Sequence, residues 1–108
     1  MTVKELSQLS YLRKEIHRLT TQISEMKQKG KVTYELEVLL KKRLNECREE
    51  LFRLEQYIET VDDSRIRQIM TLRYEQGMSW VQVAQRMGGG ASESCARMAV
   101  TRFLNKEK

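Results

Sequence analysis

Residues 78–104 read MSWVQVAQRMGGGASESCARMAVTRFL. Serine is a favoured helix N-cap and glycine a favoured turn residue, so Ser79, the glycines at Gly88–Gly90 and Ser92 predict a short helix, a turn and a longer helix. Ala84 lies four residues before the first of these glycines, where a small side chain lets two helices cross closely. This order is the sequence form of a helix-turn-helix, a motif that places its second helix in the major groove of DNA.

The second helix of this motif has apolar residues on one face at helical spacing. We expect Val83 and Met87 of the first helix to pack beneath that face. Its members are Ala96, Ala99, Val100, Phe103 and Leu104. The spacing from Gly88 to Ala96 is two residues longer than in the usual motif, and the surplus is glycine. Because ordering a glycine costs about 1 kcal/mol more than ordering an alanine, we expect a mobile turn and a second helix that settles on DNA.

Two long helices with coiled-coil patterning are predicted ahead of this motif. A T-x-x-E capping box at Thr2 and Glu5 begins the first, Gly30 suits its left-handed cap, and the second begins near Thr33. Gaps of three and four residues separate the apolar residues of both helices, as at the a and d positions of heptads. These residues are Leu9, Leu12, Ile16, Leu19, Ile23 and Met26, then Leu40, Leu44, Cys47, Leu51, Leu54, Ile58 and Val61, with Leu36 and Leu39 widening the second stripe. Similar lengths and a short connection predict an antiparallel hairpin.

The hairpin is expected to need a further surface, because two helices each bury only one narrow seam. We expect it to pack on a second copy of the chain, on the C-terminal residues, or on both. After the second stripe, Asp62-Asp63-Ser64 supplies an N-cap for a third helix, which Gly77 stops. The sequence therefore predicts a helical hairpin that serves as an oligomerisation arm over residues 1–61, and a three-helix helix-turn-helix domain over residues 62–108.

Composition excludes several classes of protein. The 108 residues include no proline, 32% charged and 6% aromatic residues, which favours an all-α fold over a small β-sandwich or barrel. No apolar run suits a membrane span or a signal peptide, so we expect a soluble protein of the cytoplasm. Two distant cysteines and one histidine do not make a zinc site, and no catalytic triad or phosphate loop is present, so we expect no cofactor, no metal and no enzyme.

The net charge of +5 allows a nucleic-acid partner without establishing one. Residues 1–30 and residues 62–108 each carry a surplus of three positive charges, and residues 31–61 carry one negative charge in excess. The surplus is therefore shared between the first helix and the helix-turn-helix, and the motif supports DNA binding more strongly than the charge does.

Several short motifs in the C-terminal half resemble a known family. They are Leu72-Arg73-Tyr74, Gly77, Met78-Ser79-Trp80, Val83-Ala84, Met87-Gly88, and Ser92 through Arg97. Together they resemble the promoter-reading fourth region of bacterial sigma factors and, more closely, the small phage-encoded ArpU/RinA-type late-gene transcription regulators with a sigma-like helix-turn-helix. In that family, as here, an Arg-Tyr pair precedes Ser-Trp-x-x-Val-Ala, and the chain ends in an Arg-Phe/Tyr-Leu helix. The resemblance covers about the last half of the chain, and the hairpin resembles the family only in general character.

The resemblance implies DNA contacts for the outward residues of both helices of the motif. In the second helix, Ser94, Arg97, Met98 and Thr101 are placed to reach base edges, and Ser92 lies at its start. Arg97 can donate in a fork to O6 and N7 of guanine. The residues implied to contact the DNA backbone are Arg102 and Lys106 in the second helix and Gln82, Gln85 and Arg86 in the first.

Some side chains keep two interpretations. Trp80 is either a plug in the core, which is the favoured reading, or an exposed contact. Glu93 either reads N4 of cytosine or caps the start of the second helix. Arg73 suits a base edge or a phosphate, whereas Arg65 and Arg67 are expected to be solvated.

Two arginines of the second helix carry the DNA-binding interpretation. Arg97 and Arg102 share a helix face on which the sequence indicates no matching acid, which favours contact with DNA over a role in solubility alone. Substitution of either residue should therefore weaken binding to DNA.

The residues and the resemblance together predict a phage-encoded, sequence-specific regulator of transcription, most simply of late genes. It would bind double-stranded DNA as a dimer formed through the hairpin, so that two helices meet two half-sites. One alternative is a DNA-packaging subunit like the small terminase, which also combines a helix-turn-helix with oligomerising helices. The other is an interaction module that docks on host RNA polymerase, as sigma-like helices do.

Overall fold

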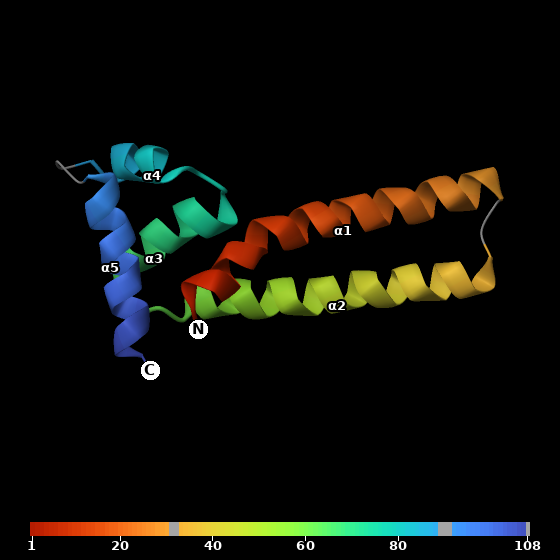
Figure 1. Cartoon of the computed structure of the whole chain (residues 1–108), viewed down its shortest axis with the longest axis horizontal. Helices are drawn as coiled ribbons and strands as arrows, with labels where there is room; N and C mark the ends of the chain where they lie inside the picture. Colours follow the sequence, from red (N-terminus) through yellow and green to blue (C-terminus); the bar gives the residue numbers. More distant parts are fainter. Residues whose placement is uncertain (31–32, 89–91, 108) are drawn as a thin grey trace. The chain divides into compact units, whose positions relative to one another are not determined.

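The computed structural model describes residues 1–30, 33–88 and 92–107, which are predominantly helical. The elements are α1 (Val3–Lys29), α2 (Tyr34–Glu59), α3 (Ser64–Met70), the π-helical turn η1 (Thr71–Glu75), α4 (Trp80–Met87) and α5 (Glu93–Lys106) (Figure 1). The described residues contain no strand, and none of their helices has the length and apolarity that a membrane span requires. The predicted all-α fold is confirmed.

The two long helices pack against each other as an antiparallel pair (Figure 1). Their N-caps are those predicted, because the hydroxyls of Thr2 and Thr33 accept from the backbone N–H groups three residues later at 3.1 and 3.3 Å. Residues Tyr11–Arg53 form one compact unit. Its buried residues and those packed against them are Leu19, Leu40 and Leu44, with Ile16, Ile23, Met26 and Cys47. The predicted hairpin is confirmed over this range.

Two apolar residues expected in the second stripe are exposed instead. Leu36 is 37% exposed and Leu39 is 43% exposed. Neither residue occupies an a or d position of the stripe, so the 3.6-residue helical repeat turns both away from the seam. The expectation that they widen the buried stripe is wrong.

The second compact unit is formed by an N-terminal and a C-terminal segment of the chain. It comprises Met1–Ser10 together with Leu54–Lys108. The hydroxyl of Tyr57, near the end of α2, donates to the carboxylate of Glu107 after α5. The buried apolar residues of this unit are Leu6, Leu9, Leu54, Ile58, Val61, Ile66, Ile69, Met70, Tyr74, Val83, Ala84, Ala96, Val100 and Leu104. The first turns of α1 and the last turns of α2 therefore group with the short helices in one compact unit, and the predicted domain division after residue 61 stays a prediction.

The predicted third helix consists of two segments. Asp63 caps α3 by accepting from the N–H of Ile66 at 3.1 Å, as predicted, and η1 follows without a break. Gly77, with φ of +69°, ends this segment in the left-handed region. The half-buried Arg67 donates to the carbonyl of Val61 at 2.6 Å, so the expectation that Arg67 is solvated is wrong.

The short helix and the longer helix quoted at the outset are α4 and α5. Ser79 and Gln82 form a complete capping box at the start of α4. Gly88 follows α4 with φ +65° and ψ −161°, and its N–H donates to the carbonyl of Ala84 at 3.1 Å. α5 packs on both α4 and α3. The predicted mobility of the glycine turn concerns Gly89 and Gly90, which lie outside the described residues.

Candidate nucleic-acid interface

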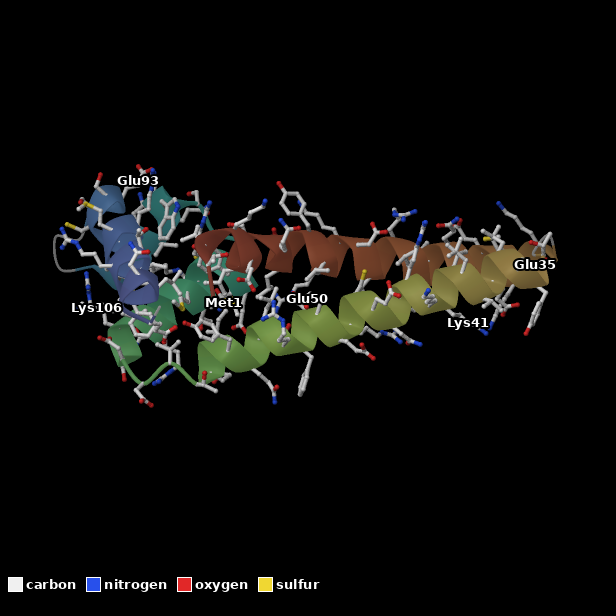
Figure 2. The ribbon with its side chains drawn as sticks, turned by 60° about the horizontal axis from the view of Figure 1, so that its bottom comes forward. Met1, Glu35, Lys41, Glu50, Glu93 and Lys106 are labelled. Carbon is white, nitrogen blue, oxygen red and sulfur yellow. The ribbon has the colours of Figure 1, made fainter. Side chains whose placement is uncertain are left out.

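α5 is a two-sided helix with one face in the core and the other in solvent. Ala96, Val100 and Leu104 are buried, and Ala99 and Phe103 are half-buried, so the predicted inward face is confirmed. Figure 2 shows side chains standing off the helix between Glu93 at its start and Lys106 at its end. The predicted DNA-contacting residues of this segment are all exposed: Ser92, Ser94, Arg97, Met98, Thr101, Arg102 and Lys106.

The start of α5 is organised by a serine cap. Ser92 Oγ accepts from the backbone N–H of Cys95 at 3.1 Å, which satisfies one donor of the first turn. Thr101 makes a local bond of another kind, because its hydroxyl donates to the carbonyl of Arg97 at 3.0 Å. The Ser92 and Thr101 hydroxyls thus both make hydrogen bonds within α5. Each residue is also exposed, and its hydroxyl oxygen can accept a hydrogen bond from a second partner.

An acid accompanies the central arginine of this face. Arg97 Nη2 lies 3.1 Å from Glu93 Oε1, in an ion pair between side chains that are 57% and 45% exposed. Glu93 therefore pairs with Arg97 and leaves the capping role to Ser92. The expectation that no acid matches the arginines of this face is wrong for Arg97. Glutamate four residues before a basic residue is the favourable orientation on a helix, but an exposed pair contributes only about 0–1 kcal/mol.

The three predicted residues of α4 are exposed as well. Gln82 uses its amide oxygen to accept from the N–H of Ser79 at 3.0 Å, so its NH₂ group is the part that suits a phosphate. Gln85 and Arg86 lie on the exposed side of the same helix. Arg86 also lines a pocket of about 330 Å³ with Glu59, Arg67, Gln68, Thr71, Leu72 and Met87.

Arg73 has a structural role that the sequence did not indicate. Its Nη1 donates to the carbonyl of Met78 at 2.9 Å, and its guanidinium carbon lies 4.9 Å from the centre of the Trp80 ring. Tyr74 meets the same indole edge-on, with 6.4 Å between ring centroids. Trp80 is half-buried, which is intermediate between the core plug and the exposed contact that the sequence left open. The Arg-Tyr and Ser-Trp pairs were visible in the sequence, but their spacing does not reveal that the side chains meet.

Further positive charge lies close to the start of α5. Hydrogen bonds from the Ser92 side chain and backbone lower the pKa of the Cys95 thiol, and the nearby guanidinium groups of Arg65 and Arg102 lower it further. Arg65 belongs to α3 and is exposed, as expected. The surface around Cys95 therefore combines cations from two helices, which suits a polyanionic partner.

Neither a metal-ligand cluster among the described residues nor a similar known protein indicates a function for this surface. Within the described ranges, no three His, Cys, Asp or Glu side chains gather as ligands of a metal ion. No family model matches the chain, and comparisons with curated proteins and with solved structures found no match. The functional interpretation therefore depends on the geometry of α4 and α5 and on the residues that they expose.

Proposed function

We propose that the chain is a sequence-specific DNA-binding regulator of transcription, of the phage late-gene type, and that α5 reads the major groove without catalysing a reaction. One observation carries the proposal. α5 is fourteen residues long and buries Ala96, Val100 and Leu104, which leaves the side that carries Ser94, Arg97 and Met98 exposed. A helix with one face anchored and a basic, mixed polar and apolar face free is the form in which helices enter the groove.

The exposed residues divide by chemistry into two groups. Arg97 offers the planar fork that suits O6 and N7 of guanine, and Met98, 48% exposed, offers an apolar surface for a thymine methyl group. Arg102 and Lys106, farther along α5, and Gln82, Gln85 and Arg86 on α4 suit phosphates. The capped start of α4 and the left-handed Gly88 support the assignment of α4 and α5 as a sigma-like helix-turn-helix.

We also propose that the hairpin arm joins two copies into a dimer. In the unit Tyr11–Arg53, the buried core among the described residues consists of Leu19, Leu40 and Leu44, a small core for two long helices. Light scattering of the purified chain tests the stoichiometry. A mass of two copies supports a regulator that meets two half-sites, whereas a ring of about eight or more copies supports the alternative of a DNA-packaging subunit.

DNA selection from a randomised pool, followed by binding measurements on the selected site, tests the proposed function. Arg97→Ala should lose about 1–3 kcal/mol of discrimination between the selected site and a mismatched one. Arg102→Ala should weaken binding to both sites alike and reduce the slope of log Kd against log salt by about one. Arg48→Ala, an exposed arginine of α2, is the matched control.

The contrary results are distinct. If Arg97→Ala and Arg102→Ala both bind as the unchanged chain does, α5 is not the DNA-reading helix. If the chain binds no DNA even at low salt but retains RNA polymerase, the interaction-module alternative replaces the proposed function.

A further inference from the structure

A pocket of about 340 Å³ lies within the unit formed by Met1–Ser10 and Leu54–Lys108. Its volume falls in the range of pockets that hold small molecules. Four elements contribute its walls, namely α1, η1, α4 and α5. The lining residues are Val3, Ser7, Arg73, Tyr74, Trp80, Arg97 and Thr101.

The charged residues that line this pocket are all positive. The described residues that line it include two guanidinium groups and no carboxylate, and one of these guanidinium groups, that of Arg97, forms a surface ion pair with Glu93. Arg73 is held in place, because it donates to the carbonyl of Met78 and lies over the indole of Trp80. The bond to Met78 uses one of the five N–H groups of a guanidinium, so Arg73 keeps donors for an anion in a fixed position.

The aromatic side of the pocket carries a second, independent feature. Tyr74 is 5% exposed, and its hydroxyl is buried without a hydrogen-bond partner among the described residues. Such a group is uncommon in folded proteins, where buried polar atoms are almost always paired. Tyr74 and Arg73 both belong to η1, and π-helical turns recur at functional sites.

We propose that this pocket binds a small aromatic carboxylate and that binding weakens the hold of the chain on DNA. The carboxylate is paired by Arg73 and Arg97, and the planar body lies against Trp80 and Tyr74. A free phosphate group would satisfy the arginines but would leave the aromatic wall without a partner, which favours a ligand with an apolar body. The regulatory half of this inference rests on the proposed function, whereas the binding half does not.

The coupling follows from the position of one residue. Arg97 lines the pocket and also belongs to the exposed face of α5 that we assign to DNA. Its pair with Glu93 is exposed and therefore weak, so a carboxylate in the pocket can draw the guanidinium away from that pair. An arginine engaged by the ligand is withdrawn from guanine. By linkage, DNA must weaken ligand binding by the same factor as the ligand weakens DNA binding.

The indole of Trp80 allows binding to be measured without DNA, because it is the only tryptophan of the chain. Benzoate is the probe, and the indole N–H resonance of the full-length chain is the signal. Benzoate should shift that resonance in a saturable way, whereas benzyl alcohol and inorganic phosphate at the same concentrations should not. Arg73→Gln and Arg97→Gln should each weaken benzoate binding about tenfold, and Arg48→Gln, at an exposed arginine of α2 outside the pocket, should leave it unchanged.

The outcomes separate the two proposals. If benzoate leaves Trp80 unshifted, or if phosphate alone shifts it equally, the assigned ligand class is overturned whether or not the chain binds DNA. If benzoate binds with the expected dependence on Arg97 but the chain binds no DNA, the pocket stands and the proposed function fails. If Arg73→Gln does not fold, Arg97→Gln decides the matter, because Arg97 is exposed. If both benzoate and DNA bind but do not compete, the coupling is overturned.

Discussion

The guanidinium of Arg97 and the carboxylate of Glu93 form an ion pair one turn apart on the exposed side of α5, with 3.1 Å between Nη2 and Oε1. The pair holds an acid on the surface that we assign to DNA, where it would repel phosphates. It also occupies the arginine that we assign to base reading. In the DNA complex that we propose, a base contact competes with this pair for the guanidinium, so Glu93 should affect binding as well as Arg97.

Glu93→Gln should strengthen DNA binding by about 1 kcal/mol, because it removes a negative charge from the interface and releases Arg97. Fluorescence anisotropy on the selected DNA site at fixed salt measures the change. Glu49→Gln, an exposed glutamate of α2, makes the same change in net charge away from α5 and should have a smaller effect. Unchanged or weaker binding by the Glu93 variant would show that this end of α5 does not approach phosphates.

Gly88→Ala should destabilise the chain by about 1–3 kcal/mol, because φ +65° with ψ −161° is a combination that L-residues with a Cβ rarely adopt. Apart from its chain neighbours, no heavy atom of the described residues lies within 4 Å of a Cβ placed there, so the expected cost comes from the backbone conformation. D-alanine at the same position, introduced by chemical ligation, favours backbone conformations with positive φ and should therefore restore most of the stability. Equal loss with both alanines would mean that crowding, not backbone conformation, selects glycine. Urea unfolding measures both variants.

Leu6→Ala should lower the free energy of unfolding by about 2–5 kcal/mol, since Leu6 is fully buried in the unit that contains the short helices. Denaturant unfolding followed by helical circular dichroism reports on both units, and the fluorescence of Trp80 reports on the unit that contains Leu6. Leu39→Ala removes the same atoms from a side chain that is 43% exposed, and it should cost about 0.5 kcal/mol or less. If Leu6→Ala has no greater effect than Leu39→Ala, the first turns of α1 do not stabilise the C-terminal unit in solution.

Cys95 should react with iodoacetamide faster than Cys47 at neutral pH. The thiolate is the reactive form, and the bonds from Ser92 lower the pKa of Cys95, whereas burial raises the pKa of Cys47. The rate profile of Cys95 should therefore rise at lower pH than that of Cys47, and Ser92→Ala should move it upward. Mass spectrometry of the alkylated chain distinguishes the two sites. A Cys95 profile that is unmoved in Ser92→Ala would remove Ser92 as the cause.

Local features of this fold could be predicted from the sequence because they depend on neighbours in the chain. The N-caps Asp63, Ser79 and Ser92 each bond three residues ahead, and the two heptad stripes need only helical periodicity. The burial of Leu6 could not be predicted, because it depends on how distant segments meet. The stacking of Arg73 on Trp80, seven residues later, depends on the path of the chain through Gly77, which residue spacing does not reveal. Of the candidate site, the sequence predicted which residues of α5 are exposed but missed the acid beside Arg97, although Glu93 stands at the favourable helical spacing.

The division of the chain into units has a consequence for how its length can change. In the sequence, residues 11–53 of the hairpin arm lie between the two segments that together form the other compact unit. The arm is therefore an insertion into that unit. Removal of one heptad from each long helix would shorten the excursion while it preserves the a and d register of both stripes. Arm length can therefore vary in paired heptads without altering α3 to α5. In the dimer that we propose, the arm would then set the distance between the two copies independently of the DNA sequence that each copy binds.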